Sequence, residues 1–308
     1  MSRILLTGYS SFTGTWFADR LAESGHEVVV CLTKTRLDYN SEFKYKFKSP
    51  HRNIKVEEKT VFGSKEFSKL ISEFKPQKFC FHHAMVDGYR DPDFDVELAV
   101  SNNLHNYAQV ISDLVASGCT EVIMSRSIFE KGVGKTDVAG DISPYGESKR
   151  KTFEIFSKDI PPQLSVKSFV ICNPVGKFEG NNLTSYLIKN WKSGQAAKLF
   201  QPKLVRDFIP IDLLSKAYAE FVDSKHSILT PSYLPISNFD YAQKIGQVIH
   251  QKYQVNTPID TSFVQYDENV PLIRIGLDKL NFLDTNQEEK FWEDFVTHLW
   301  DRLKTNDL

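Results

Sequence analysis

The first twenty-five residues carry the pattern that most constrains the fold. A short apolar strand at 3–6 is followed by the turn Thr-Gly-Tyr-Ser-Ser-Phe-Thr-Gly at 7–14 and by an amphipathic helix that closes at Gly25. This order begins a mononucleotide-binding unit, because small residues let backbone N–H groups and a helix N-terminus approach a pyrophosphate. Ser11 stands where the middle glycine of such a turn is expected. Turns need glycine anyway, but the flanking strand and helix favour a nucleotide.

Strands and helices continue to alternate after this unit. Buried strands are expected at 27–32, 54–56, 78–81, 120–124 and 165–172, and helices at 64–74, 96–117 and from 144 onward. Parallel strands buried on both faces appear as such continuous apolar runs, joined by right-handed crossovers. The pattern therefore predicts an α/β protein with a Rossmann-like doubly wound parallel sheet.

The regular alternation stops after Gly176. Residues 37–52 are expected to form a long loop, and helices are expected near 183–192, up to 221, at 241–253 and at 288–303. The chain is thus expected to form a Rossmann domain at 1–176 and a smaller mixed α/β substrate-binding lobe at 177–308, some segments of which return to the first domain. No repeat or low-complexity linker separates the two.

Charge and cysteine content exclude several classes of protein. The chain has 38 Lys and Arg against 39 Asp and Glu, so it shows no general bias toward nucleic acid or membrane. Its four cysteines are far apart in apolar runs, which favours core thiols over disulfides or metal ligands. Neither a signal peptide nor an apolar run long enough to span a bilayer is present, so a cytoplasmic location is expected.

The segment after the second strand bears on the cofactor. An NAD-preferring site usually has an acid there to hold the ribose hydroxyls, whereas this chain has Leu-Thr-Lys-Thr-Arg at 32–36. Thr33, Lys34 and Arg36 are therefore cofactor-binding candidates, and the two basic residues could meet a 2′-phosphate. NADP(H) is favoured over NAD(H), although basic residues after a strand are often only solvated loop charges.

A phenol and an ammonium lie four residues apart at the start of the helix after the fifth strand. Ser143 can cap this helix, Pro144 suits its first position, and Glu147 suits the positive end of its dipole. Tyr145 and Lys149 then share one face. A lysine beside a tyrosine stabilises tyrosinate and lowers the phenol pKa, which makes it usable as a proton donor or acceptor. On an arbitrary helix the same spacing is more often a lysine stem packed on a ring.

Polar residues near the ends of the fourth and fifth strands are further candidates. Ser125 and Ser127 emerge where the ligand crevice of a parallel sheet lies, so their hydroxyls could bond a substrate oxygen. His82 and His83 have no partner at metal-ligand spacing, so no metal is expected and one histidine is expected in the core or beside the cofactor. Asn102, its neighbour Asn103, and Asn106 form either an exposed stripe or a functional one.

Together these residues resemble the extended short-chain dehydrogenase/reductases, a family of nucleotide-sugar epimerases, dehydratases and 4-ketoreductases. The likeness spans nearly the whole chain. It implies cofactor contacts from the glycine turn, from the strand end at 81–85 and from an asparagine of structural importance: Gly8, Ser11, Phe12, Thr13, Gly14, His82, Ala84, Met85 and Asn102. Asn173 and the Arg-Asp-Phe-Ile run that begins at Arg206 are similar to segments that hold a nucleotide sugar, so a nucleotide-sugar substrate is expected.

The resemblance also implies a mechanism. Tyr145 exchanges a proton with the sugar oxygen, Ser125 hydrogen-bonds that oxygen, and Lys149 holds the ribose of the cofactor. The chain lacks the Asp-Glu pair that follows the catalytic hydroxyl in dehydratases, which argues against dehydration. The Ser-Ile-Phe run at 127–129 and the basic residues after the second strand are more similar to the reductases, so an NAD(P)-dependent 4-ketoreductase is expected first and an epimerase second. The chain departs from the family pattern at Ser11, after the second strand, at Lys59 and Thr60, at Val170 and at 175–177.

Other functions remain open. A non-catalytic nucleotide-binding member could keep the fold, although an intact Ser125, Tyr145 and Lys149 argue for an enzyme, and a non-nucleotide carbonyl compound could be the substrate. Family members often form homodimers through paired helices, and a homodimer is expected here. Core packing explains the same apolar candidates equally well: Ala108, Ile111, Leu114, Phe153 and Phe156.

Overall fold

The computed structural model describes residues 1–39, 51–137, 139–264, 271–282 and 284–303. Contacts divide the chain into two compact units. The first contains residues 1–133, 139–171 and 215–230, and the second contains 134–138, 172–214 and 231–308. The two-domain division after Gly176 stays a prediction, since the chain passes between these units more than once.

The first unit is built on a sheet of seven strands in the order β11–β7–β5–β4–β1–β2–β3. All neighbouring pairs are parallel. The strands are β1 (Arg3–Leu6), β2 (Glu27–Cys31), β3 (Ile54–Glu57), β4 (Lys78–Phe81), β5 (Glu121–Ser127), β7 (Ser165–Ile171) and β11 (Ile228–Leu229). The chain order reverses between β1 and β4, which is where ligands bind outside the carboxyl ends of such strands. The predicted Rossmann-like sheet is confirmed.

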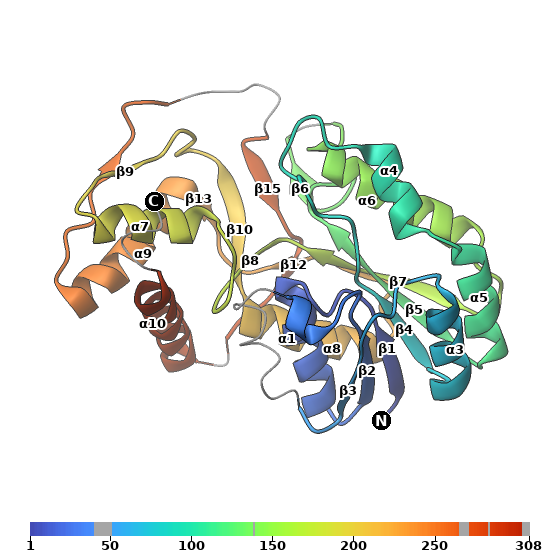
Figure 1. Ribbon diagram of the computed structural model, residues 1–308. Helices are drawn as coiled ribbons and strands as arrows, with labels where there is room; N and C mark the ends of the chain where they lie inside the picture. Colours follow the sequence, from blue (N-terminus) through green and yellow to red (C-terminus); the bar gives the residue numbers. More distant parts are fainter. Residues whose placement is uncertain (40–50, 138, 265–270, 283, 304–308) are drawn as a thin grey trace. The chain divides into compact units, whose positions relative to one another are not determined.

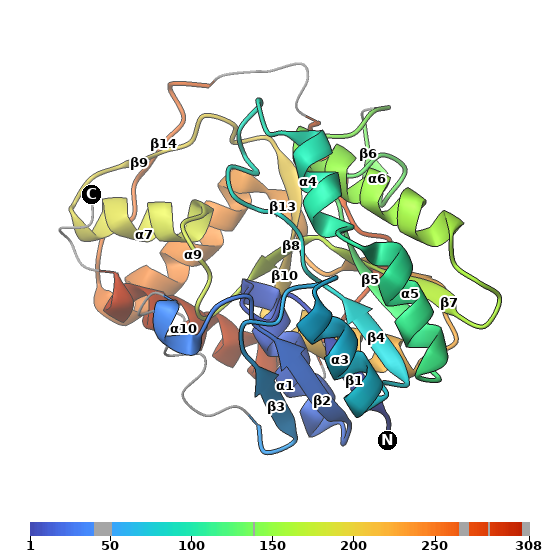
Figure 2. The ribbon, with the colours of Figure 1, turned by 45° about the vertical axis from the view of Figure 1, so that its right-hand side comes forward.

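Helices cover both faces of this sheet (Figure 1). On one face, α3 (Lys65–Phe74), α5 (Tyr107–Ala116) and α6 (Pro144–Lys158) bury apolar side chains in the main core cluster. On the other face, α1 (Phe12–Glu23) and α8 (Ile211–Asp223) meet where the rings of Phe17 and Tyr218 stack at 3.9 Å between centroids. Figure 2 shows α3 and α5 side by side, while α4 (Val96–Asn103) lies along α6.

The second unit contains a mixed sheet with helices. Its strands are β6 (Lys135–Thr136), β8 (Asn173–Val175), β10 (Val205–Pro210), β13 (Pro235–Ser237) and β15 (Ile273–Ile275), with the order β13–β10–β15–β6 and β8 paired to β10. Short pairs join β9 (Ala197–Lys198) to β14 (Ile259–Asp260) and β12 (Pro231–Ser232) to β16 (Asp278–Lys279). Its helices are α7 (Leu183–Lys192), α9 (Asn238–Tyr253) and α10 (Thr285–Arg302).

Two expected elements differ from those observed. The helix expected at 96–117 is broken into α4 and α5, because Asn106 adopts a left-handed conformation and its amide donates to Gly63 O at 2.9 Å. The strand expected at 120–124 continues to Ser127 as β5, so the two candidate serines lie within the strand. A short 3-10 turn occupies Arg36–Asp38 at the start of the expected loop, and residues 40–50 of that loop lie outside the described part.

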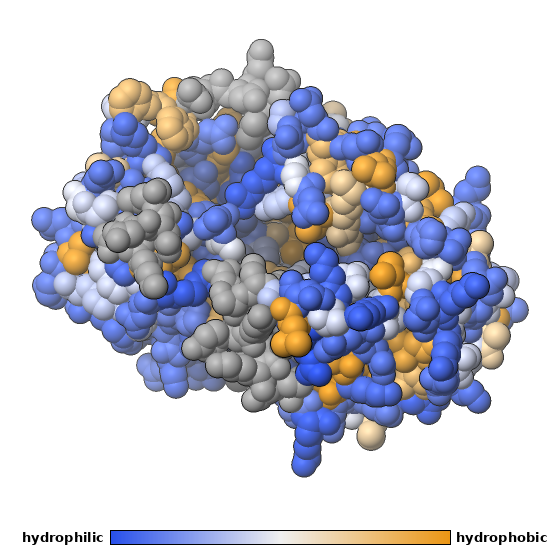
Figure 3. Space-filling view, in the orientation of Figure 1, coloured by the Kyte–Doolittle hydropathy of each residue, from blue (hydrophilic) through white to orange (hydrophobic). Residues whose placement is uncertain are grey.

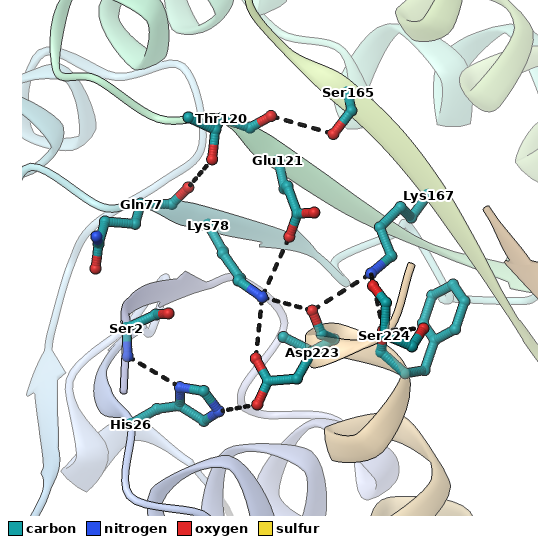
Figure 4. Close-up of polar contacts among 12 residues, drawn as sticks. Ser2, His26, Gln77, Lys78, Thr120, Glu121, Ser165, Lys167, Asp223 and Ser224 are labelled. Atoms are coloured by element: carbon teal, nitrogen blue, oxygen red, sulfur yellow. Dashed lines mark hydrogen bonds and ion pairs between the residues drawn. The ribbon is translucent and has the colours of Figure 1, made fainter. Parts of the chain in front are cut away.

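Lysines at the amino ends of the central strands hold the end of α8 (Figure 4). Lys78 Nζ donates to Val222 O at 2.6 Å and to Asp223 Oδ1 at 3.0 Å. Lys167 Nζ donates to Phe221 O at 2.8 Å. The last carbonyls of a helix have no partner within the helix, so the two ammonium groups satisfy them.

His26 completes this amino-end network. Its Nδ1 accepts a hydrogen bond from Ser2 N at 3.2 Å, and its Nε2 lies 3.0 Å from Asp223 Oδ2. Because a backbone N–H occupies Nδ1, the ring proton lies on Nε2 and is donated to the carboxylate. The network therefore ties the start of β1, the start of β2 and the end of α8 together.

The apolar candidates for a dimer face mostly lie inside the first unit. Ile111, Leu114 and Phe156 are buried in the core cluster, and Phe153 packs against it. Core packing, one of the two alternatives that the sequence left open, therefore accounts for these residues, and the homodimer stays a prediction. The side of the molecule in Figure 3 is mainly hydrophilic with small, scattered apolar patches. None of the helices described is both long and apolar enough to cross a membrane.

Candidate active site

The helix that carries Tyr145 and Lys149 begins as its sequence predicts. Ser143 is the N-cap of α6 and accepts a hydrogen bond from Gly146 N at 3.1 Å, and Pro144 occupies the first turn. A Cβ added at Gly146 would lie 2.1 Å from Phe129 O. The first turn of α6 therefore packs backbone to backbone on the turn that follows β5. This close approach fixes the position of Tyr145, the preceding residue.

Aromatic rings surround the Tyr145 side chain. The rings of Tyr89, Phe94 and Phe129 meet it edge to face, with centroids 5.5, 6.1 and 6.4 Å away. Burial raises the pKa of Tyr145, and the negative charge of Glu130 raises it further. The sequence suggested the opposite, a pKa lowered by Lys149. In the protein alone the phenol is thus held in its protonated form.

Lys149 lies one helical turn beyond Tyr145 and is buried, with a relative exposure of 6%. Burial lowers its pKa to about 8, while Glu130 raises it and Arg126 lowers it. An ammonium in this environment is charged at neutral pH but close to its titration. Tyr145 and Lys149 therefore share one face of α6, as their spacing predicted.

The glycine turn closes tightly on the strand beside it. Gly8 has a φ of +74°, and a Cβ there would lie 2.8 Å from His82 C and His83 N. A Cβ at Gly14 would lie 2.2 Å from Gly8 O. Ser11 is the N-cap of α1, and its Oγ accepts from Gly14 N at 2.9 Å. The serine that replaces the middle glycine thus supplies a cap to the helix whose N-terminus would face a phosphate.

His82 connects this turn with β5. Its Nε2 lies 2.9 Å from Thr13 Oγ1 and 3.1 Å from Ser11 Oγ, and its Nδ1 lies 2.6 Å from Ser125 Oγ. Burial lowers the pKa of His82 to about 3, and the charge of Lys149 contributes. A neutral imidazole between hydroxyl groups can both donate and accept. Three predicted site residues and His82 therefore form one continuous hydrogen-bonded chain.

His83 and an asparagine fix the segment after β4. His83 Nε2 bonds Asn103 O at 3.1 Å, and its Nδ1 lies 2.9 Å from Thr7 Oγ1. Asn103 Oδ1 accepts from Met85 N at 2.8 Å, and Asn103 Nδ2 donates to Thr152 Oγ1 at 3.2 Å. Asn102, expected in this role, is exposed, so the prediction is wrong by one residue. The helix turns Asn103 inward and Asn102 outward.

A buried ion pair that the sequence did not single out follows Ser125. Arg126 donates from Nε to Glu130 Oε2 at 2.8 Å, and the carboxyl is fully buried. Glu130 Oε1 also accepts from Ser127 N at 2.7 Å, and Ser127 Oγ accepts from Phe129 N at 3.2 Å. Opposite charges four residues apart at the end of an apolar strand are the signal that could have identified the pair.

The basic residues after β2 are only partly free to meet a phosphate. Arg36 Nε donates to Glu58 Oε1 at 2.5 Å, whereas Lys34 is exposed. Thr33 Oγ1 lies 3.3 Å from Tyr39 OH. Among the described residues, no group of three His, Cys, Asp or Glu side chains could hold a metal ion.

The substrate-binding candidates Asn173 and Arg206 lie in the second unit. Asn173 in β8 is paired with Phe208 of β10, two residues beyond Arg206. The guanidinium of Arg206 donates from Nη1 to Val205 O at 3.3 Å and to Pro271 O at 3.4 Å. Burial lowers its pKa to about 10, against the effect of Asp137. The two residues therefore belong to one sheet, as part of a unit separate from Tyr145.

The strand order and the crossover helices define a Rossmann-like α/β protein. The sequence pattern of the NAD dependent epimerase/dehydratase family matches residues 4–232, most of the chain. The chain therefore belongs to this family, and its resemblance to the extended short-chain dehydrogenase/reductases is confirmed. No curated protein sequence matches it.

Solved structures with the same fold cover almost the whole chain. The enzyme WbmH of Bordetella bronchiseptica in complex with NAD+ has a TM-score of 0.72 at 17% identity, over 98% of this chain and 99% of that one. UDP-glucose 4-epimerase of Thermotoga maritima with UDP-glucose has a TM-score of 0.70 at 16% identity, over 98% and 100%. The B. bronchiseptica enzyme WbmG with NAD and UDP has a TM-score of 0.68 at 19% identity, over 99% and 97%.

Proposed function

We propose that the protein is an NAD(P)-dependent oxidoreductase that reduces the keto group of a nucleotide-linked sugar, most favourably a 4-keto-deoxysugar. The observation that carries the proposal is the pair that α6 presents, a Tyr145 phenol packed among aromatic rings and a buried Lys149, in the same unit as the glycine turn. Family membership supports nicotinamide chemistry. The UDP-glucose and UDP named in similar structures support a nucleotide-linked substrate.

In this proposal Tyr145 is the catalytic proton donor. Its phenol is protonated in the buried site, so it can give a proton to a carbonyl oxygen. Lys149 remains charged at neutral pH and binds ribose hydroxyls while it stabilises the tyrosinate that forms. The rings of Tyr89 and Phe94 exclude water from the phenol.

Ser127 is the better candidate for the hydroxyl that bonds the substrate oxygen. Ser125 Oγ lies 2.6 Å from His82 Nδ1, whereas Ser127 Oγ accepts from Phe129 N at 3.2 Å and retains its own O–H for donation. Ser127 lies two residues nearer the carboxyl end of β5 and on the same strand face, where ligands of parallel sheets bind. Ser125 would then act indirectly, by orienting His82 under the glycine turn. Separate Ser125→Ala and Ser127→Ala variants assign the roles: Ser127→Ala is expected to lose more turnover, and Ser125→Ala more cofactor affinity.

The residues of the first unit fit a dinucleotide. The tight turn at Gly8 and Gly14 leaves no room for a side chain, and the N-terminus of α1 begins directly after it. When bound there, the cofactor supplies hydride transfer. Its contacts are proposed from the turn, from the segments after β2 and β4, and from α6: Gly8, Ser11, Phe12, Thr13, Gly14, Thr33, Lys34, Arg36, His82, Ala84, Met85, Tyr145 and Lys149.

Preference for NADP(H) now depends mainly on Lys34, because Arg36 is paired with Glu58. Fluorescence titration of the purified protein with NADPH and NADH tests this. Tight NADPH binding that weakens in Lys34→Ala, with NADH binding unchanged, supports a reductase that exchanges NADP(H). Equal binding of both cofactors by the wild-type protein contradicts the preference.

Turnover on a panel of keto-sugar nucleotides tests the enzyme itself. Tyr145→Phe should abolish reduction while cofactor binding is retained. Reduction of simple carbonyl compounds with a KM that Arg206→Ala leaves unchanged would instead show a substrate without a nucleotide. No turnover in the wild type, despite cofactor binding, would favour a non-catalytic nucleotide-binding protein.

A nucleotide-sugar epimerase is the second candidate, supported by the 4-epimerase among the similar structures. An epimerase regenerates its cofactor within each turnover. Stoichiometric NAD that remains bound through purification, together with interconversion of sugar epimers without added cofactor, would establish epimerisation and exclude the reductase.

A further inference from the structure

Two hydroxyl groups at the start of α1 share one nitrogen of a buried histidine. Ser11 Oγ lies 3.1 Å, and Thr13 Oγ1 lies 2.9 Å, from His82 Nε2. The other ring nitrogen, Nδ1, lies 2.6 Å from Ser125 Oγ on β5. Burial lowers the pKa of His82 to about 3, so the imidazole is neutral and carries one ring proton. The position of that proton therefore fixes the direction of all three hydrogen bonds.

The distances assign the proton to Nε2. Hydrogen bonds with an N–H donor to oxygen span about 2.7–3.2 Å between heavy atoms, whereas those with an O–H donor are shorter, about 2.5–3.0 Å to oxygen. The separation of 2.6 Å at Nδ1 fits the Ser125 O–H as donor and Nδ1 as acceptor. The ring proton then lies on Nε2, and the separations of 2.9 and 3.1 Å fit an N–H shared between Thr13 Oγ1 and Ser11 Oγ. Ser125 thus donates to His82, and His82 donates to the start of α1.

This direction decides what the Ser11 hydroxyl can do. As the N-cap of α1, Ser11 Oγ accepts from Gly14 N at 2.9 Å, and it also accepts from His82 Nε2. Both lone pairs of the oxygen are then in use. The Ser11 O–H itself has no acceptor among the residues that the structure describes. It therefore remains as a donor at the N-terminus of α1, where the helix dipole and the unpaired backbone N–H groups favour an anion.

We propose that His82 is a positioning residue for the cofactor: by donating from Nε2 to Ser11 Oγ, it leaves the Ser11 O–H as a donor for the diphosphate of a dinucleotide bound at the glycine turn. This inference rests on the proposed function and gives a role to the serine that replaces a glycine of the turn. A glycine there would offer only its backbone N–H. The hydroxyl adds a hydrogen bond to a charged group, which is stronger than one between neutral groups.

The tautomer can be measured by NMR in the cofactor-free wild type. In protein with isotope-labelled histidine, two-bond proton–nitrogen correlation spectra distinguish a ring proton on Nε2 from one on Nδ1. The His82 signals are identified by their absence in His82→Gln. We expect a neutral ring protonated on Nε2 that does not titrate down to about pH 5, because burial lowers the pKa of His82 to about 3. A proton on Nδ1 overturns the proposal.

Calorimetric titration with ADP-ribose, which has the diphosphate but no nicotinamide, measures the effect on binding. Ser11→Ala removes the O–H and should weaken binding about tenfold, whereas His82→Met removes only its orientation and should weaken binding about fivefold. His82→Gln keeps an N–H donor near the position of Nε2 and should retain most of the affinity. Thermal unfolding confirms that the variants are folded. Equal losses in His82→Gln and His82→Met would show that the packing of the ring, rather than its donor, is responsible, and would contradict the proposal.

A double-mutant cycle tests whether His82 acts through the Ser11 hydroxyl. Once Ser11→Ala has removed that hydroxyl, His82→Met should weaken ADP-ribose binding no further. His83→Met is the matched control, because the neighbouring His83 bonds Thr7 Oγ1 and Asn103 O instead. Its effect should be the same with and without Ser11→Ala. Additive losses in Ser11→Ala and His82→Met would show that His82 acts by another route, and the proposal would be wrong.

None of these measurements needs turnover, so the two proposals can fail separately. If the wild type binds ADP-ribose but reduces no sugar nucleotide, the proposed reaction fails, and the tautomer and the cycle still decide the role of His82. If reduction proceeds while the ring proton lies on Nδ1 or the cycle is additive, only the role of His82 fails. A wild type that binds neither ADP-ribose nor NADPH overturns both.

Discussion

The two ends of the seven-stranded sheet both bury lysines, but they satisfy them differently. At the amino ends, Lys78 and Lys167 donate to the last carbonyls of α8 (Figure 4). At the carboxyl ends, Lys149 is equally hidden, yet no hydrogen-bond partner for its Nζ exists among the residues that the structure describes. An ammonium whose N–H groups are all hydrogen-bonded within the protein stabilises the fold. An ammonium without such partners has N–H donors available for a ligand.

Acid–base properties separate Lys149 from Lys78 but not from Lys167, because burial lowers the pKa of Lys167 as well. Burial opposes the charge of Lys78, but hydrogen bonds with Asp223 and the charge of Glu121 outweigh it and raise the pKa. Burial dominates at Lys149 and lowers the pKa to about 8. Lys78 and Lys149 are therefore shifted in opposite directions.

Among these variants, replacement of Lys149 should have the largest effect, and the quantity affected should be turnover. Lys149→Met is expected to reduce turnover about a hundred- to ten-thousand-fold, the usual contribution of a positioned acid–base group. The free energy of unfolding at neutral pH should stay the same or rise, because a buried unpaired charge is removed. Steady-state kinetics and urea denaturation measure the two effects. If Lys149→Met retained turnover, Lys149 would not differ in function from the structural lysines at the amino ends.

The amino end should respond in the opposite way. Lys167→Met leaves the carbonyls of Phe221 and Ser224 without their donor, so the free energy of unfolding should fall by about 2–3 kcal/mol. Turnover per folded molecule should be unchanged. Urea denaturation and kinetics on the same preparation check this, and a selective loss of turnover would show that the anchor also shapes the site.

The pH dependence of stability should separate the two lysines. Because the Lys149 pKa is about 8 in the folded state and 10.5 ordinarily, the unfolded state binds more protons between these values. The stability of the wild type relative to Lys149→Met should therefore rise by roughly 2 kcal/mol as the pH increases from about 8 to about 10.

Lys78 provides the matched control for this measurement. Its pKa is raised in the folded state, so its contribution is present throughout that window and is lost only at higher pH. The stability difference between the wild type and Lys78→Met should stay constant from pH 8 to about 10. Parallel curves for the two variants would refute the division.

A smaller effect tests which asparagine supports the carboxyl end. Asn103→Ala should destabilise the protein by about 1–2 kcal/mol, because Met85 N and Thr152 Oγ1 lose their buried partner. Asn102→Ala, at an exposed position, should change stability by less than about 0.5 kcal/mol. Thermal unfolding measures both variants. If Asn102→Ala were the more destabilising of the two, Asn102 would be the supporting asparagine, as the sequence predicted.

Patterns that depend on local chemistry were predicted well. Apolar runs placed the central strands, and the N-cap Ser143 with Pro144 marked the start of α6. The separation of Tyr145 and Lys149 on one helix follows from helix geometry alone. Family membership confirms the nicotinamide-linked class that these residues suggested.

Features that depend on tertiary contacts were missed. The break between α4 and α5 comes from Asn106 reaching Gly63, a contact that no local pattern contains. Asn103 rather than Asn102 is buried because of the way the last turn of α4 is oriented, directly before this break. The sign of the Tyr145 pKa shift depends on burial and on Glu130, whose position relative to α6 is set by the packing of Phe129 on Gly146.

The N-cap role of Ser11 decides what a substitution at this position would do. As the N-cap of α1 it bonds Gly14 N, one of the N–H groups at the helix end nearest the glycine turn. Exchange of an N-cap serine for glycine changes helix stability by only a few tenths of a kcal/mol. A glycine at this position would therefore leave the helix almost as stable, and would remove the contact between Ser11 Oγ and His82 Nε2.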